Sequence, residues 1–593
     1  MKAFKFILCL LFVLVLVNGR QPAAAAPPSK QAAHPAQVPV DYRFGVIESY
    51  ENPTEANNLG VAWTRVRFQW ADVQAGGPDS WTPTVTEGQI DGEIGSGRTV
   101  VGLLIGIPDW ARDGSLPAGL WLPHDDPNNT WANFVRQAVS RYDGRISHWI
   151  IWNEPDINDS NAPGHTWSGS VNDFFQLQRV AYLIAKETNP NVKIHLPAFT
   201  YFWNPNYIYE LMDVIVTDPA AAENNYYFDA ITAHLYFQPD SVFNIIQSFY
   251  GAVLGRGIPW KPLWLVETNA PPSKDPAWPV SNWTFQVTLD EQAAYMPQAL
   301  AVAMAAGAQR IAVYKLQDVP GDETANPEPF GLLRLDGSRR PAFSSYQIAI
   351  RYMAGTQSAN RERWDHVGQV KLDQGDYITH VLFSRLPAPQ QPQIEATANT
   401  AVLVDMWGSR RTIAAQDGLF TVDLPGAPCV QTAGDYCMIG GPVSYLIQAV
   451  EGGVPPVDAP PADTAPATDT PDPDTATPTA ETEITKTATT APIQTATDTP
   501  TFTNIPSQTP RPTDTVTATA VPIQPTPTQI SAAAPTNQPT NTPIPATTVA
   551  ESIPTPASNN QLPATAANLS FIFMGGGLLL ALGLGVLYWR NGR

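Results

Sequence analysis

The sequence predicts an α/β protein whose main domain is a (β/α)8 TIM barrel, followed by a small all-β sandwich domain. Between residues 41 and 355, eight apolar runs are each followed by room for a helix: 43–48, 62–68, 99–106, 147–153, 192–197, 228–236, 262–267 and 310–316. Eight alternating β and α units over about 300 residues are typical of this barrel. Residues 361–450 instead contain short alternating segments separated by turns, which are typical of a sandwich.

The elements follow from the period of the apolar residues. Residues 131–142 have apolar side chains at helical spacing, which predicts a helix on the outside of the barrel. In the second domain, residues 377–383, 401–407, 418–424 and 443–448 alternate with a period of two, which predicts strands. No pair of carboxylates stands at strand ends there, so this domain is expected to be a packing module.

The N-terminus predicts export. Residues 1–26 contain Lys2 and Lys5, then an apolar run, then four alanines, which is the pattern of a signal peptide. Of the three cysteines, Cys9 belongs to this segment, so Cys429 and Cys437 remain in an oxidising compartment. We therefore expect a disulfide between them.

The charge of the chain limits its partners. The formal net charge is −20, whereas nucleic acids and anionic membrane surfaces are bound by clusters of Lys and Arg. The sequence thus argues against nucleic acid and is compatible with a neutral polysaccharide or oligosaccharide.

The C-terminal part predicts a tether. Residues 454–567 are rich in Thr, Pro and Ala and have few large apolar side chains, so we expect a disordered, extended linker. Residues 569–589 are long and apolar enough for a transmembrane helix, with Arg590 and Arg593 on the cytoplasmic side. Both features predict an extracellular protein anchored at the cell surface.

Residues 562–566 add a second possibility for the anchor. The segment Leu-Pro-Ala-Thr-Ala resembles the sorting signal that sortases cleave, although its last residue is usually Gly. Two interpretations stay open: covalent attachment to the cell wall after cleavage at Thr565, or a retained membrane anchor.

Two glutamates follow buried strands of the predicted barrel. The fourth apolar run leads into Asn153, Glu154 and Pro155, and the seventh ends in Glu267. Active sites of such barrels lie at the carboxyl ends of the strands. A pair of carboxylates there points to glycoside hydrolysis, in which one protonates the leaving oxygen and the other attacks the sugar or activates water.

These residues resemble a family. Asn153-Glu154-Pro155 on the fourth strand, His234-Leu235-Tyr236 on the sixth and Glu267 on the seventh are similar to the pattern of the large clan of (β/α)8 retaining glycoside hydrolases that includes xylosidases, cellulases, mannanases and arabinofuranosidases. The resemblance implies that Glu154 is the acid/base, Glu267 the nucleophile and Asn153 a donor to the sugar 2-hydroxyl. The residues show no apparent metal cluster, and no cofactor is expected.

Neighbouring residues on the strands are expected to support the pair. His234 and Tyr236 share one face of a strand, so the phenol can reach the nucleophile and the imidazole can bridge toward the acid. Arg65 and Arg67 also share a face, and an inward arginine needs a carboxylate partner. Arg65 matches the arginine that supports the nucleophile in the clan, and Arg67 is expected to be structural.

Tryptophans are expected to play two roles. Trp110 and Trp203 follow predicted strands and are expected to contact sugar, because exposed rings offer apolar platforms. Trp149, Trp152 and Trp264 lie within strands and are expected to pack in the core. The eighth strand lacks the tryptophan that many clan members have, which puts the shape of the sugar subsite in question.

One alternative function belongs to another class. A catalytically inactive carbohydrate-binding surface protein would also be rich in tryptophan and tethered by a long linker. A separation of more than about 8 Å between the carboxyl groups of Glu154 and Glu267 would favour it, or an inverting enzyme. The choice of glycan, and of endo or exo action, depends on loops that the strand pattern does not describe.

Overall fold

The computed structural model describes residues 40–162, 164–281, 284–325, 328–451 and 453. The predicted signal peptide (1–26), linker (454–567) and terminal helix (569–589) lie outside the described residues. The chain divides into two compact units, Met1–Ala465 and Pro466–Arg593, and all the described residues belong to the first. Among the described residues, no helix is both long and apolar enough to cross a membrane.

The predicted barrel is present. Eight parallel strands close in the order β1-β10-β9-β8-β7-β6-β3-β2, so each strand pairs with its neighbours along the chain. Their bounds are β1 Phe44–Val46, β2 Trp63–Gln69, β3 Thr99–Ile105, β6 His148–Ile151, β7 Lys193–Phe199, β8 Ala230–Tyr236, β9 Leu263–Asn269 and β10 Ala308–Val313. Each overlaps one of the eight apolar runs in the sequence, because a strand buried on both faces must be continuously apolar.

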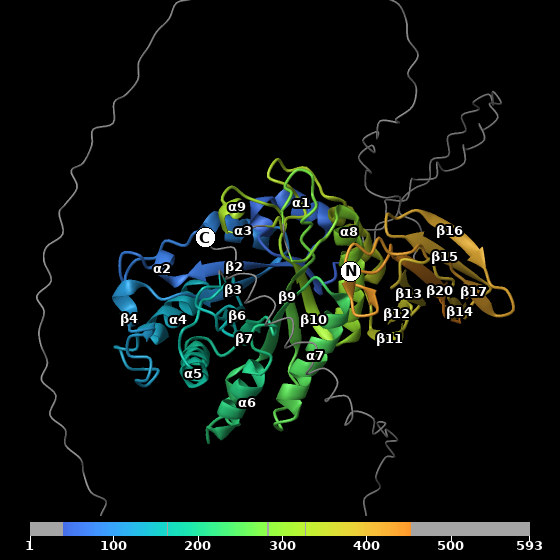
Figure 1. Ribbon diagram of the computed structural model, residues 1–593. Helices are drawn as coiled ribbons and strands as arrows, with labels where there is room; N and C mark the ends of the chain where they lie inside the picture. Colours follow the sequence, from blue (N-terminus) through green and yellow to red (C-terminus); the bar gives the residue numbers. More distant parts are fainter. Residues whose placement is uncertain (1–39, 163, 282–283, 326–327, 452, 454–593) are drawn as a thin grey trace, which may run out of the picture. The chain divides into compact units, whose positions relative to one another are not determined.

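Helices follow the strands, and Figure 1 shows α4 to α7 on the outside of the barrel. The helices are α1 Pro53–Leu59, α2 Trp70–Val73, α3 Glu87–Gly95, α4 Thr130–Arg141, α5 Val171–Thr188, α6 Tyr207–Thr217, α7 Pro239–Leu254, α8 Leu289–Ala305, α9 Asp322–Ala325 and α10 Pro341–Met353. Short elements complete the loops: η1 Ser49–Glu51, η2 Asp109–Ala111, η3 Asn225–Tyr227, β4 Arg112–Asp113 and β5 Leu116–Pro117. Ser170 and Thr288 begin α5 and α8 with capping boxes, which satisfy free N–H groups of the first turn.

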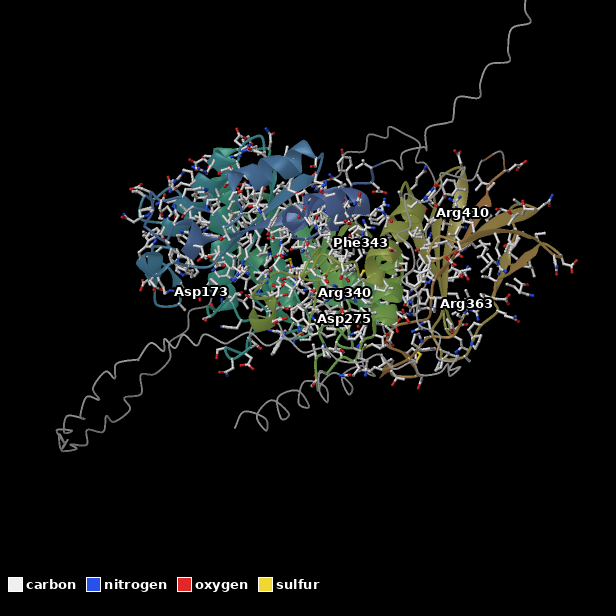
Figure 2. All side chains as sticks on the ribbon, turned by 90° about the horizontal axis from the view of Figure 1, so that it is seen from above. Asp173, Asp275, Arg340, Phe343, Arg363 and Arg410 are labelled. Atoms are coloured by element: carbon white, nitrogen blue, oxygen red, sulfur yellow. A yellow bond between two sulfur atoms is a disulfide. The ribbon has the colours of Figure 1, made fainter. Side chains whose placement is uncertain are left out.

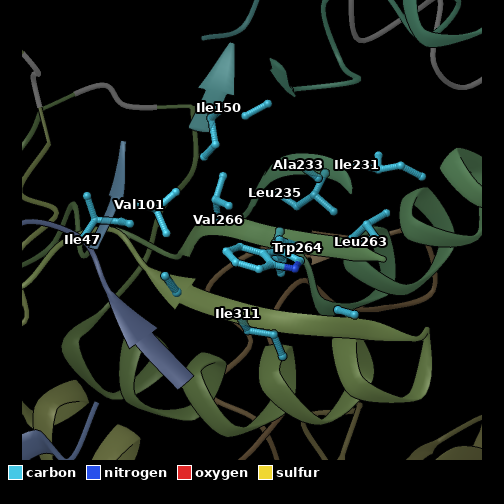
Figure 3. Packing of buried hydrophobic residues seen from close by; sticks show 14 of the residues in the cluster. Ile47, Val101, Ile150, Ile231, Ala233, Leu235, Leu263, Trp264, Val266 and Ile311 are labelled. Carbon is cyan, nitrogen blue, oxygen red and sulfur yellow. The ribbon is translucent and has the colours of Figure 1, made fainter. Parts of the chain in front are cut away.

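An aromatic layer fills the barrel below its carboxyl end. The rings of Trp63 and Trp264 lie 5.5 Å apart, and His195 packs edge-on against Trp264 at 4.6 Å. Figure 3 shows Trp264 among aliphatic side chains, including Ile150 and Ile311. Trp63 precedes Arg65 and Trp264 precedes Glu267 on their strands, so this layer forms a floor under the strand ends. The expectation of packing holds for Trp149, Trp152 and Trp264, which are all buried.

The second domain is the expected antiparallel β domain, and its two sheets differ in size. One sheet has six strands in the order β11-β12-β13-β20-β15-β16, and the other layer is the pair β14-β17. The bounds are β11 Ser358–Trp364, β12 Val367–Asp373, β13 Tyr377–Ser384, β14 Gln393–Glu395, β15 Thr400–Asp405, β16 Arg410–Ala414, β17 Leu419–Thr421, β18 Thr432–Ala433, β19 Tyr436–Cys437 and β20 Ser444–Ala449.

The two faces of the six-stranded sheet explain this difference. On one face Val370, Val381 and Ile447 belong to the same apolar core as the barrel, and on the other Leu382 and Leu446 pack with residues of β14 and β17. The barrel therefore covers the face that a second full sheet would cover in a sandwich. The sheet also begins at Ser358, before the expected boundary at 361, because β11 alternates between exposed and half-buried residues and gives no apolar signal.

Polar contacts fix this domain on the barrel, some of them from the loop that the disulfide closes. Asp240 at the start of α7 accepts hydrogen bonds from Trp364 and Arg385, and the buried Gln298 of α8 bonds to the backbone of Gly440 and Gly441. Cys429 and Cys437 form the expected disulfide. Val430, within that loop, donates to Glu291 in the first turn of α8, so the loop lies against the barrel.

Candidate active site

The backbone turns sharply where the fourth barrel strand meets the Asn-Glu-Pro motif. The strand β6 ends at Ile151, two residues earlier than expected, and both Trp152 and Glu154 have positive φ angles, of 74° and 50°. Such angles are rare for residues with a side chain and recur at functional sites. Glu154 N–H donates to the carbonyl of Ala198 at 2.9 Å, which ties the motif to the end of β7.

Asp156 secures this turn. Its carboxylate is fully buried and accepts hydrogen bonds from the backbone and hydroxyl of Thr200 and from the backbone of Tyr201. Burial raises the pKa of Asp156 to about 6, against the lowering effect of the hydrogen bonds from Thr200. Sequence reasoning gave Asp156 no role, although its position two residues after Glu154, beyond a proline, was the available signal.

His234 connects the two glutamates. Its Nδ1 lies 2.7 Å from Oε1 of Glu154, and its Nε2 lies 3.2 Å from Nη1 of Arg65 and 3.4 Å from Oε1 of Glu267. Because the guanidinium only donates, Nε2 is placed to accept and Nδ1 to donate its proton to Glu154. The predicted bridge toward the acid therefore has a defined direction.

Both oxygens of Glu267 have partners. Arg65 donates to Oε1, and the phenol of Tyr236 donates to Oε2. Burial alone would raise the pKa of Glu267, but His234, Arg65 and the hydrogen bond from Tyr236 outweigh it and hold the pKa below its usual value. Burial and the adjacent Glu267 raise the pKa of Tyr236 well above its usual value, so the phenol keeps its proton.

Glu154 differs from Glu267 in its surroundings. Its side chain is 17% exposed, against 8% for Glu267. Its Oε1 faces His234, while Oε2 has no hydrogen-bond partner among the described residues. One oxygen of Glu154 is thus available to carry a proton, and neither oxygen of Glu267 is.

The two carboxylates are close together. One oxygen of each and a ring nitrogen of His234 all lie within 4.8 Å of one another. Retaining glycosidases have their carboxyl groups about 5–5.5 Å apart, and inverting ones about 6.5–9.5 Å. The donor types would also suit a metal ion, but Arg65 already places a positive charge against Glu267 and His234.

The eighth strand supplies a tyrosine where a tryptophan was sought. Tyr314 follows β10, and its ring packs edge-on against Phe330 at 5.2 Å, which in turn packs against Tyr236 at 5.8 Å. Burial raises the pKa of Tyr314 well above its usual value, with Glu48 and Glu267 adding to the effect. Sequence reasoning looked for one residue type here and missed Tyr314.

The remaining predicted residues separate into two groups. Trp110 is 39% exposed and lines a cavity of about 710 Å³. The side chain of Asn153 forms no hydrogen bond within the described residues, so its amide is available to a ligand. Trp203 is 47% exposed and lines neither the cavity of about 710 Å³ nor a second one of about 480 Å³. Arg67 was expected to pair with a carboxylate, and instead it is exposed and bonds to Gln69.

Comparisons with known proteins bear on the fold. No protein-family model and no curated protein sequence matches the chain. A family 39 glycoside hydrolase from the gut symbiont Bacteroides cellulosilyticus WH2 has a TM-score of 0.51 and 15% identity, over 69% of this chain and 81% of that one. A glucosidase from Croceicoccus marinus has a TM-score of 0.46 and 13% identity, over 69% and 96% of the two chains. A GH30 endoxylanase from Clostridium papyrosolvens C71 has a TM-score of 0.45 and 14% identity, over 69% and 97%. At 15% identity, the first likeness shows a shared fold.

Proposed function

We propose that the protein is a retaining glycoside hydrolase that cleaves β-glycosidic bonds in polysaccharides or oligosaccharides by double displacement. The observation that carries the proposal is the pair Glu154 and Glu267, with oxygens within 4.8 Å and unequal surroundings. Two carboxyl groups whose environments differ are the usual basis for separate acid and nucleophile roles.

The first step forms a covalent intermediate. A Glu267 oxygen attacks the anomeric carbon while the bond from that carbon to the leaving oxygen breaks, and Glu154 gives its proton to the leaving oxygen. In the second step Glu154, now a carboxylate, takes a proton from water, whose oxygen attacks the anomeric carbon and releases Glu267. Arg65 and Tyr236 hold Glu267 charged and oriented for the attack.

The spacing supports catalysis over the alternative of an inactive carbohydrate-binding protein. A binding surface has no need for a buried and a half-buried carboxylate bridged by a histidine and backed by an arginine, because burying these charges costs free energy. The exposed Trp110 and Trp203 fit either function and do not distinguish them.

The test uses substitutions at both glutamates in the full-length protein. Glu267→Gln should abolish cleavage of all glycosides, whereas Glu154→Gln should abolish cleavage of poor leaving groups and spare activated aryl glycosides, which need no acid. NMR of the first product should show the anomeric configuration of the substrate. The exposed Glu395→Gln on β14 is the matched control.

Two results would contradict the proposal. Activity that survives both substitutions would remove the glutamates from the reaction. A first product of inverted configuration would replace double displacement by a single displacement through water.

We also propose the location of the enzyme from residues outside the described part. Residues 1–26 support export, residues 454–567 a disordered linker, and residues 569–589 either a membrane anchor or a sortase-processed attachment to the cell wall. Truncation after residue 453 should release a soluble, active enzyme into the medium. If a sortase cleaves at Thr565, replacement of Thr565 should move the protein from the cell-wall fraction to the membrane fraction. If the C-terminal helix is a retained anchor, the protein should be in the membrane fraction with or without the replacement. Cell fractionation with immunoblotting measures both.

A further inference from the structure

The cavity of about 710 Å³ lies at the carboxyl ends of three neighbouring barrel strands. It is lined by residues at the ends of β2, β3 and β6 and in the loops that follow them, among them Arg67, Gln69, Gly106, Trp110, Trp152 and Thr166. Its volume is in the range of small-molecule sites, about 300–1,000 Å³. Neither Glu154 nor Glu267 lines it, so it is separate from the carboxylate pair.

The loop after β6 joins the cavity to that pair. Trp152 lines the cavity two residues before Glu154, and its indole donates to Thr166, which in turn donates to the carbonyl of Asn153 at 2.6 Å. A side chain added at Gly164 would lie 3.5 Å from Oε2 of Glu154, and the next residue, His165, lines the cavity. A glycan chain held at Glu154 therefore has this cavity beside it.

Arg67 presents a free edge of its guanidinium to the cavity. Its Nε and one Nη2 hydrogen point to Oε1 of Gln69, at 3.2 and 2.8 Å, and it forms no ion pair with any described carboxylate. The opposite edge, formed by Nη1 and Nη2, keeps its hydrogens for a ligand. This edge matches the two oxygens of a carboxylate, which guanidinium binds in a planar, bidentate way.

The position of Arg67 is fixed by its neighbours. Gly106 has a φ of +85°, and a Cβ atom there would lie 2.3 Å from Nε2 of Gln69. The absence of a side chain at Gly106 therefore leaves room for the Gln69 amide, which accepts the hydrogen bonds from Arg67. The second arginine of the cavity, Arg112, differs because it faces Asp109 at 3.8 Å and donates to the carbonyl of Ile107. Arg67 is the cavity cation without an acidic partner among the described residues.

Trp110 supplies a surface beside this charge. Its indole nitrogen donates to the carbonyl of Gln74 at 2.8 Å, and its ring packs edge-on against the buried Trp70. The ring is therefore held in one orientation, with 39% of its surface exposed. A fixed exposed ring suits the apolar face of a pyranose.

We propose that this cavity is a subsite for a sugar unit that carries a carboxylate, with Arg67 binding the carboxylate and Trp110 the ring. The substrate class is then a uronate-containing polysaccharide, whose acidic unit is a neighbour of the sugar attacked by Glu267. This inference rests on the proposed hydrolase activity for its place in a reaction, whereas binding of a uronate in the cavity would not require that activity.

The test uses polymers that differ only in the carboxyl group. Glucuronoxylan and mannuronate-rich alginate, whose backbones are β-linked, are each compared with a sample whose uronate carboxyls have been reduced to primary alcohols. On a cleaved polymer, full-length wild-type protein should have a kcat/KM about tenfold to hundredfold higher for the uronate form, as expected for a hydrogen bond between charged groups. Arg67→Gln should remove this preference, and Arg67→Lys, which keeps the charge but not the fork, should restore only part of it.

A control and a binding measurement complete the design. Arg411→Gln on β16 changes the net charge equally, at an exposed residue of the second domain, and should keep the preference. Affinity electrophoresis of full-length Glu267→Gln in gels containing each polymer measures binding without turnover. Retardation should occur with uronate polymers and be lost when Arg67→Gln is added.

The outcomes separate this proposal from the proposed function. Cleavage of glycans with no preference for uronates would leave the hydrolase and overturn the subsite. Retardation that depends on Arg67, with no cleavage of any glycan, would support the subsite and count against the hydrolase. Equal retardation by dextran sulfate would overturn the assignment to a carboxylate, because it would show a site for anions in general.

Discussion

Two clusters of charged residues each pair an arginine with carboxylates, but they differ in whether a ligand could reach them. In the first, Arg340 at the start of α10 lies between Asp275 and Asp318, with distances of 2.7 and 2.6 Å, and all three side chains are at most 1% exposed. Figure 2 shows Arg340 beside Asp275. Gly331 N–H donates to the other oxygen of Asp318, and Arg334 and Ala277 donate to Asp275. Every carboxylate oxygen of this Arg340 cluster therefore has a protein partner.

In the second cluster Arg65 joins Glu267 and, through His234, Glu154. Here one oxygen of Glu154 remains without a protein partner among the described residues, and its side chain is partly exposed. A saturated cluster can only hold loops together, whereas a cluster with one open oxygen can exchange a proton with a ligand. Burial and pairing are therefore common to both clusters, and the open oxygen of Glu154 is what distinguishes the second.

Removal of Arg340 should have the largest effect. Arg340→Leu leaves two buried carboxylates without their cation, which costs about 3–5 kcal/mol of unfolding free energy, measured by urea unfolding. The activity of the molecules that remain folded should change little. Arg334→Leu, which removes a partly exposed partner of the same Asp275, is the control and should cost less. Equal losses would mean that the burial of Arg340 does not matter.

Removal of Arg65 should mainly affect activity. Arg65→Leu removes a charge and a hydrogen bond that lower the pKa of Glu267, so kcat/KM should fall by about a hundredfold. Because a nucleophile must be ionised, the acid limb of the pH profile should move to higher pH in the variant. Arg363→Leu on β11, at a half-buried residue paired with Asp365 in the second domain, should leave the profile unchanged. An unmoved acid limb in Arg65→Leu would show that Arg65 does not set this pKa.

Asp156 sharpens the comparison, because it is a buried carboxylate with hydrogen bonds and no cation. Its pKa is raised from 3.8 to about 6 on folding, so the folded state binds more protons between these values. Its contribution to stability is present below about pH 4 and is lost as pH rises through about 6. Asp156→Asn should remove roughly 2 kcal/mol of the stability difference between pH 4.5 and pH 7. Urea unfolding of the wild type and of Asp156→Asn at pH 4.5 and pH 7 measures this change in the free energy of unfolding. If both proteins lost the same stability between these pH values, the raised pKa of Asp156 would be contradicted.

The barrel and the carboxylate pair could be predicted because their signals are local. A strand buried on both faces must be apolar throughout, and a glutamate at its end stands out from packing residues, as Glu267 does after Leu265 and Val266. The strands β11 and β12 gave no such signal: β11 is half-exposed, and Gly368 in β12 leaves room for the ring of Phe383 on the next strand. The covering pair β14-β17 was also not predictable. Both faces of the six-stranded sheet carry apolar residues, and these residues do not indicate which face the barrel covers.

The sequence by itself determined the order of the eight barrel strands, the residues at their ends and the cysteine pair, because strand period and chain order are properties of neighbouring residues. Only the tertiary structure decided that β6 ends early with Glu154 turned by positive φ angles, that Tyr314 fills the position sought for a tryptophan, and that Arg67 faces a cavity beside the carboxylates. These three features depend on contacts between residues far apart in the chain. Such contacts set the direction of a side chain and decide which hydrogen-bonding groups of a charged residue remain free.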